Sequence, residues 1–217
     1  MLGEACGLNR ATAWRILSTM ETHGLVTCQR DTGQWVIGPG LVELAQLAGT
    51  DALLAAAHGI LERLSMQAGE TAALALVTGR GLSYVDDVTP PAVVSASWRG
   101  RAVPLHATST GKALLAFSDG RAQRLTRRDL VRFTDTTIVS PSAMAQELAE
   151  TRRRGYGVCR GEYEESAWGV SAPVLDSRGR PVAVVSLWGP ADRVTDERLG
   201  PLGELVREAA LRLASSR

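Results

Sequence analysis

A chain of 217 residues with 45% hydrophobic and 22% charged residues has the composition of a folded globular protein, which excludes a disordered chain. Its length suits a small domain followed by one of about 150 residues, and its apolar runs are too short to span a bilayer. Three widely spaced cysteines and no signal-peptide pattern after Met1 predict a cytoplasmic protein with reduced thiols. The net charge of +1 does not by itself indicate a nucleic-acid or membrane partner.

The first predicted element is a helix over residues 9–23, with Asn9 as its N-cap. Apolar residues recur along it at helical spacing: Ala13, Ile16, Leu17 and Met20. Two short strands are predicted next, over 25–30 and 34–38. A helix followed by a β-hairpin is the order of a winged helix-turn-helix, so residues 1–38 are predicted to form a DNA-binding domain.

Residues 39–68 have a helical pattern that is interrupted at 49–51, which predicts a linker helix over 39–50 and a second helix that starts a new domain. Strands and helices then alternate to the end of the chain. The predicted strands are 71–78, 82–88, 92–98, 156–163, 168–176 and 181–189, and the predicted helices are 109–117, 122–126, 141–154 and 196–214. Residues 51–217 are therefore predicted to form an α+β domain with a central sheet.

The outer face of the first helix carries side chains that suit DNA recognition. Arginine can contact guanine edges or phosphates, and hydroxyl groups can contact phosphate oxygens. The candidate DNA-binding residues are Arg10, Thr12, Trp14 and Arg15 on the helix, with Arg30 and Gln34 in the hairpin. Against this, residues 1–38 hold three arginines and three acidic residues, with no basic surplus. The alternative is an amphipathic helix whose outer face is only solvated.

Several motifs occur together in one order along the chain. They are CGLNRATAWRILSTMETHGLV, GQWVIGPGLVELA, LHATSTGKALLAF, ELAETRRRGYGV, RGEYEES and SAPVLDSRGRPVAVVSLWGP. In this combination the chain resembles IclR-family transcriptional regulators over nearly its whole length. The resemblance implies an N-terminal winged helix-turn-helix, a linker helix and a C-terminal GAF-like effector domain with a central antiparallel sheet. It also implies operator DNA, a small-molecule effector and a homodimer or dimer of dimers.

The chain departs from the family pattern at its start. Only LGEAC remains of the helix that should precede the recognition helix, and the first helix of the motif is absent. The apolar stripe of residues 13–20 would then lack part of the surface on which it packs. We expect Met1 to be a late or misassigned translation start. The alternative is a metabolite-binding protein whose shortened N-terminal domain no longer binds DNA.

The segment HATSTGKALL resembles a phosphate-binding loop but lacks two of its parts. The loop needs glycine where His106 lies and a hydroxyl where Ala113 lies. In the family this segment lines the effector pocket, so the amides of Ser109, Thr110 and Gly111 could receive a carboxylate. The alternative is an ordinary helix cap at residue 108 or 109.

The acidic segment RGEYEES lacks a nearby histidine to complete a transition-metal site. It is predicted to be a solvated strand end whose acids pair with residues 152–154, and no metal or cofactor is expected. Cys159 and His106 lack a third group that would orient them as a catalytic pair, so no catalytic residue and no enzyme activity are expected.

Family members that bind small polar acids carry Asp, Cys and Ser-x-Ser at four positions, and this chain differs from them at three of the four. This chain has Cys159, Gly169, Ser186 and Trp188. Loss of a carboxylate and gain of an indole predict a larger, more apolar or aromatic effector. Trp98 or Trp168 could join the pocket wall; the alternative for each tryptophan is core or interface packing.

Overall fold

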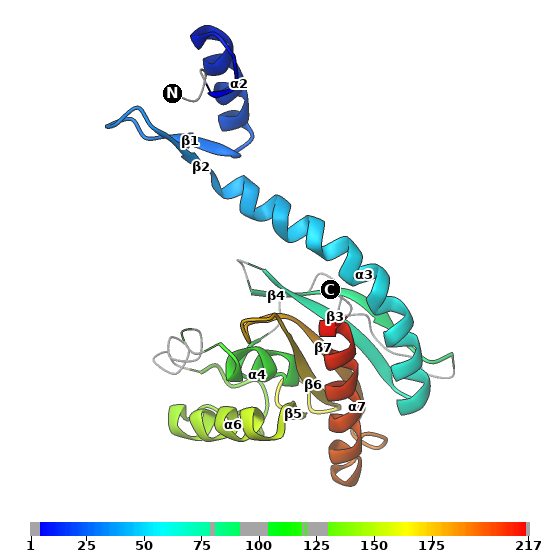
Figure 1. Ribbon diagram of the computed structural model, residues 1–217. Coiled ribbons are helices and arrows are strands. Elements are labelled where there is room, and N and C mark those ends of the chain that lie inside the picture. The colour runs from blue at the N-terminus through cyan, green and yellow to red at the C-terminus, as the bar shows by residue number, and fades with distance from the viewer. Residues whose placement is uncertain (1–4, 79–80, 92–103, 119, 121–129, 216–217) are drawn as a thin grey trace. The chain divides into compact units, whose positions relative to one another are not determined.

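The computed structural model describes residues 5–78, 81–91, 104–118, 120 and 130–215, with side chains described there except at 42–53, 55 and 78 (Figure 1). The chain forms two compact units, residues 1–52 and 53–217. Within the described residues, no helix is long and apolar enough to cross a membrane.

The first unit begins with α2 (Arg10–Thr22), which confirms the predicted helix. It starts after Asn9, whose side-chain oxygen accepts a hydrogen bond from the Thr12 amide at 2.8 Å. This contact satisfies one of the amides that a helix start leaves without an intrahelical partner.

A two-stranded antiparallel hairpin follows, formed by β1 (Val26–Cys28) and β2 (Trp35–Ile37). The Cys28 amide donates a hydrogen bond to Glu21 Oε1 at 2.9 Å, which ties the hairpin to the end of α2. The predicted helix-then-hairpin order is confirmed, with strands shorter than expected.

Helix α3 runs without a break from Pro39 to Ala68, so the predicted interruption at 49–51 is wrong. A single glycine costs about 1 kcal/mol inside a helix. Alanine and leucine, the best helix formers, surround Gly49 on both sides and outweigh that cost.

The second unit is built on one five-stranded antiparallel sheet in the order β4-β3-β7-β6-β5, which confirms the predicted central antiparallel sheet. Its strands are β3 (Thr71–Thr78), β4 (Gly81–Val88), β5 (Gly157–Arg160), β6 (Ala167–Leu175) and β7 (Pro181–Pro190). Its helices besides the end of α3 are α4 (Ser109–Ala116), α6 (Pro141–Arg154) and α7 (Asp196–Ser215). The predicted strand 92–98 and helix 122–126 lie outside the described residues.

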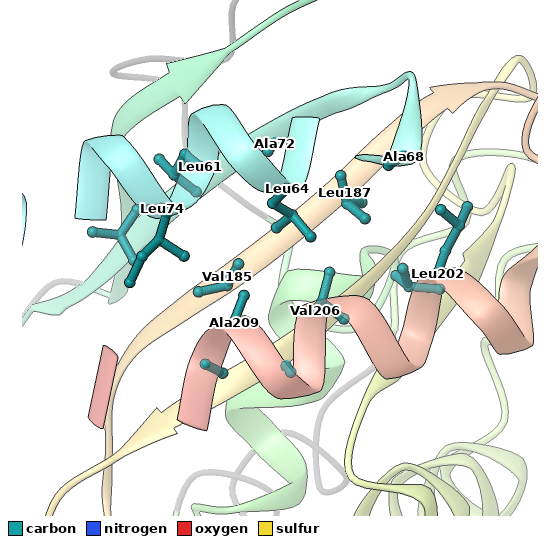
Figure 2. Packing of buried hydrophobic residues seen from close by; sticks show 14 of the residues in the cluster. Leu61, Leu64, Ala68, Ala72, Leu74, Val185, Leu187, Leu202, Val206 and Ala209 are labelled. Carbon is teal, nitrogen blue, oxygen red and sulfur yellow. The ribbon is translucent and has the colours of Figure 1, made fainter. Parts of the chain in front are cut away.

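Side chains of the sheet alternate between two apolar layers, as the two-residue period of a strand requires. On β7, Val185 and Leu187 pack against α3 and α7 in the larger layer, and Figure 2 shows the three elements meeting there. Val184 packs on the opposite face with Ala113 and Leu114 of α4. The next two positions on that face, Ser186 and Trp188, are polar or amphipathic, and they mark where the α4 face changes from core to pocket.

Glu70 closes the end of the sheet where α3 leads into β3. Its carboxylate is 1% exposed and accepts hydrogen bonds from Arg193 at 3.0 and 2.8 Å. Arg198 contacts the same carboxylate at 3.3 Å and donates to the carbonyl of Ala68, the last residue of α3, at 2.6 Å. A buried carboxylate that is paired in this way can be tolerated. Its ion pairs join the end of α3 to the segment that leads into α7.

Candidate functional site

Helix α4 begins at the centre of the second unit, and all of its residues are buried. Thr108 is its N-cap: Thr108 Oγ1 accepts a hydrogen bond from the Gly111 amide at 3.0 Å. The predicted cap at residue 108 is therefore present, and it uses one of the three amides proposed for a carboxylate. Gly111 itself packs against the backbone of Leu105, where a Cβ atom would clash.

Five buried hydroxyl groups join the start of α4 to strands β4, β6 and β7. The shortest contact, 2.7 Å, is between Tyr84 Oη and Thr110 Oγ1. The other contacts are Ser109–Ser171 at 2.8 Å, Thr110–Ser186 at 2.9 Å, Ser171–Ser186 at 2.9 Å and Thr110–Ser171 at 3.2 Å. We call these five residues the hydroxyl cluster. Burial raises the pKa of Tyr84 to about 12, although hydrogen bonds partly offset the shift.

A pocket of about 500 Å³, counted to its open mouth, lies over part of this cluster. Trp188 and Tyr84 meet edge to face in its wall, with ring centroids 5.4 Å apart. The lining residues are Tyr84, Thr108, Ser109, Thr110, Cys159, Tyr163, Glu164, Ala167, Trp168, Gly169 and Trp188.

Most of the predicted effector residues come together at this pocket. Those that line it are Ser109, Thr110, Cys159, Gly169 and Trp188. Ser186 does not line it but belongs to the hydroxyl cluster beneath. Gly111 is turned to Leu105 and is not part of the lining. Trp98 lies outside the described residues.

Sequence reasoning missed several lining residues, of which Tyr84 is the most informative. Tyr84 lies opposite Ala75, and a β-bulge between Leu74 and Ala75 shifts the β3–β4 register at that point. Leu82 and Tyr84 share the α4 face by ordinary strand alternation, but the sequence alone did not show which face of β4 meets α4. Trp168, the tryptophan considered for the wall, does line the pocket.

Gly169 allows a close approach between two strands. It pairs with Trp188 across β6 and β7. A Cβ atom at position 169 would lie 2.5 Å from the Leu187 carbonyl oxygen and 3.0 Å from Trp188 Cβ. The glycine therefore lets β7 approach and seats the indole, whose buried Nε1 has no hydrogen-bond partner in the described structure.

The acidic segment after β5 corrects another expectation, because Glu162 is buried and not solvated. Strand β5 ends at Arg160, and Glu162 Oε1 lies 2.5 Å from Lys112 Nζ. Lys112 is 1% exposed and also donates to the Val158 carbonyl at 3.0 Å. The pairing predicted with residues 152–154 is wrong for Glu162, since a buried lysine on α4 requires a buried acid as its partner. Glu164 and its neighbour at 165 are exposed, as expected.

Nor does the structure form a catalytic pair from Cys159 and His106. Burial, reinforced by the nearby Glu162 charge, raises the pKa of the Cys159 thiol although Lys112 opposes the shift. The thiol contacts the Ala107 carbonyl at 3.4 Å, and a neutral thiol is a poor nucleophile. His106 Nε2 lies 2.8 Å from the carbonyl oxygen of Val131.

The candidate DNA-binding residues lie on the surface of the first unit. Arg10, Trp14 and Arg15 of α2 are exposed and Thr12 is half-buried; Arg30 and Gln34 are exposed in the hairpin. Trp14 also packs edge to face against Trp35 of β2, with centroids 5.6 Å apart, which links the helix to the hairpin. No residue of α2 is buried, and Ile16 of the apolar stripe is 44% exposed.

We expect Gly169→Ala to lower the free energy of unfolding by about 1–3 kcal/mol, because the new methyl group would push β6 from β7. Urea denaturation followed by circular dichroism measures the change. Gly59→Ala in α3 is the matched control, since a Cβ there would meet only the flexible Arg63 side chain, at 3.7 Å. Equal losses in both variants would contradict the close-approach explanation.

Comparison with known proteins shows which family has this architecture. Residues 45–215 match the family model described as bacterial transcriptional regulator IclR C-terminal. The chain is 34% identical to the transcriptional repressor IclR of Escherichia coli (strain K12) over 219 residues, which cover 96% of this chain and 78% of that protein. It is 31% identical to the regulator XynR of the same organism, over 98% of this chain and 86% of that protein.

Solved structures agree over nearly the whole chain. The IclR of Thermotoga maritima superposes with a TM-score of 0.71 at 28% identity, covering 99% of this chain and 88% of that one. An IclR homolog from Microbacterium hydrocarbonoxydans, complexed with 4-hydroxybenzoate, superposes with a TM-score of 0.68 at 28% identity and the same coverage. The resemblance drawn from the sequence is confirmed: the chain belongs to the IclR family of transcriptional regulators, which are not enzymes.

Proposed function

We propose that this regulator is of the repressor type and that a small aromatic or apolar organic metabolite, bound in the pocket, controls its affinity for DNA. The observation that carries the proposal is the pocket wall, in which the indole of Trp188 meets the ring of Tyr84. Several relatives are named as repressors, which supports repression over activation as the mode of regulation.

The pocket chemistry favours an aromatic ligand over a small polar acid. Offset or edge-to-face contact with a ring adds about 0.5–1.5 kcal/mol beyond the burial of apolar area. The polar groups of the floor are neutral hydroxyls, and Glu164, the acid of the lining, is exposed. A relative with the same fold has been captured with an aromatic compound, 4-hydroxybenzoate, which further supports this class.

A negatively polarised part of the ligand would lie against the start of α4. The amides of Ser109 and Thr110 occupy the first two positions of the helix, where amides have no intrahelical acceptor. The positive end of the helix dipole adds to their attraction for an anion. Because Thr108 already uses the amide of Gly111, we assign two amides to this role and not three.

The first unit would carry the DNA contacts. Arg10 and Arg15 on α2 and Arg30 in the hairpin are exposed, as phosphate or base contacts require. Thr12, Trp14 and Gln34 complete the proposed surface. A homodimer or a dimer of dimers would bring together the two DNA-binding units that a symmetric operator needs.

We expect 4-hydroxybenzoate to bind more tightly than glyoxylate in isothermal titration calorimetry. Trp188→Ala should weaken its binding about tenfold or more, because the ring loses its stacking partner. Trp35→Ala is the matched control, since that indole belongs to the first unit and should leave the affinity unchanged. Tighter binding of glyoxylate, or an unchanged affinity in Trp188→Ala, would overturn the proposed ligand class.

For the first unit, we expect the double variant Arg10→Ala, Arg15→Ala to bind DNA from upstream of its own gene more weakly than the wild type does. Loss of two phosphate contacts should lower the slope of log affinity against log salt by about 2. Fluorescence anisotropy over a salt series measures both quantities. Arg178→Ala, in the exposed turn between β6 and β7, removes a charge outside the first unit and should change neither.

If the wild-type chain shows no DNA binding even at low salt, the DNA-binding role fails. The neutral charge balance of residues 1–38 would then favour the alternative of a metabolite-binding protein that does not read DNA.

A further inference from the structure

Aromatic rings form much of the pocket wall, and the wall carries a negative charge. Four of the lining residues are aromatic: Tyr84, Tyr163, Trp168 and Trp188. Among the residues that the structure describes, Glu164 is the one charged side chain of the lining, and no lysine, arginine or histidine lines the pocket. A bound ligand therefore meets rings, neutral polar groups and one carboxylate.

The buried charges next to Cys159 do not offset this carboxylate. Lys112 Nζ lies 2.5 Å from Glu162 Oε1, and opposite charges at such a distance largely cancel each other farther away. Glu147, 3.9 Å from the same Nζ, is paired in turn with Arg154 at 2.7 Å. None of these four residues lines the pocket. Glu164 is therefore the uncompensated side-chain charge of the described pocket wall.

Glu164 is free to pair with a ligand. Within the described part of the chain, its exposed carboxylate has no ion pair and no hydrogen bond. Its backbone, by contrast, is tethered: its carbonyl accepts a hydrogen bond from the Ala167 amide at 2.9 Å, and Thr134 donates to the Gly161 carbonyl at 2.7 Å. A charge on a tethered segment loses less conformational freedom when it binds.

The rings favour the same sign of charge as Glu164 does. The face of an aromatic ring carries partial negative charge and attracts an ammonium group, and indole attracts it most strongly. Trp188 and Tyr84 have ring centroids only 5.4 Å apart, so one cation can lie within reach of both. Rings and carboxylate together therefore suit a cation, and Glu164 would repel an anion.

We infer that the ligand is an aromatic amine whose positively charged ammonium group lies among the pocket rings and Glu164. This inference rests on the proposed ligand-binding function and narrows it. The same ligand can carry a carbonyl, hydroxyl or carboxylate group against the amides of Ser109 and Thr110. An aromatic acid without an amino group would satisfy those amides but would leave Glu164 without a partner.

Benzylamine and benzyl alcohol are matched probes for this inference, because they have nearly the same size and differ in charge at neutral pH. In isothermal titration calorimetry, benzylamine should bind the wild-type protein about tenfold more tightly than benzyl alcohol. The preference should decrease as the salt concentration rises, since Glu164 is exposed and salt screens exposed charges.

Two neighbouring acids provide the variant and its control. Glu164→Gln should reduce the preference for benzylamine to about threefold or less, because the ion pair is lost and only the rings remain. Glu165→Gln removes the adjacent exposed charge, which does not line the pocket, and should retain the full preference. Both side chains are exposed, so neither substitution should change the melting temperature.

The outcomes separate the inference from the function on which it rests. Equal binding of the two probes, or tighter binding of benzyl alcohol, would overturn the inference while the pocket stands. An equal loss of preference in Glu164→Gln and Glu165→Gln would also overturn it, and so would binding of 4-hydroxybenzoate without binding of benzylamine. If none of the three compounds binds, the proposed function fails and the inference with it.

Discussion

Helix α4 lies so close to the sheet that a Cβ atom added at Gly157 of β5 would come within 2.5 Å of the Ser109 carbonyl oxygen. This close approach is the constraint on which the pocket depends. It brings the first residues of α4 over β6 and β7, where small hydroxyl side chains can span the gap. Longer side chains at these positions would separate the layers, and the cluster of hydrogen bonds would be lost.

The far side of the same helix is held by charge. Breaking a buried ion pair such as Lys112–Glu162 by removing one partner typically costs about 3–5 kcal/mol, because the other charge is left unpaired. The pair also fixes the segment that carries Tyr163 into the pocket wall. Threonine hydroxyls at 134, 136 and 137 reinforce that segment by donating to the carbonyls of residues 160–162, and Phe133 packs edge to face on Tyr163 at 4.9 Å.

Local signals in the sequence predicted most of the described helices and strands, because caps such as Asn9 and alternating apolar residues act over a few positions. The errors concern features that depend on distant partners. Gly49 was predicted to interrupt the helix, but the helix-forming residues around it keep α3 continuous. Glu162 was read as solvated because its buried partner is fifty residues away in sequence. Tyr84 was missed because the sequence does not show which face of β4 meets α4. Gly169 was predicted to line the pocket, but its close approach to β7 was not foreseen because its partner strand was unknown.

The central claim is that pocket occupancy changes DNA binding, which requires the ligand to favour one of two states of the protein. The most direct measurement is the affinity for DNA upstream of its own gene, by anisotropy, with and without saturating 4-hydroxybenzoate. The account predicts a change of about fivefold or more in the wild type, and in Trp188→Ala the same change only at a ligand concentration about tenfold or more higher. If the ligand binds the wild-type protein while its DNA affinity stays the same, the account is contradicted.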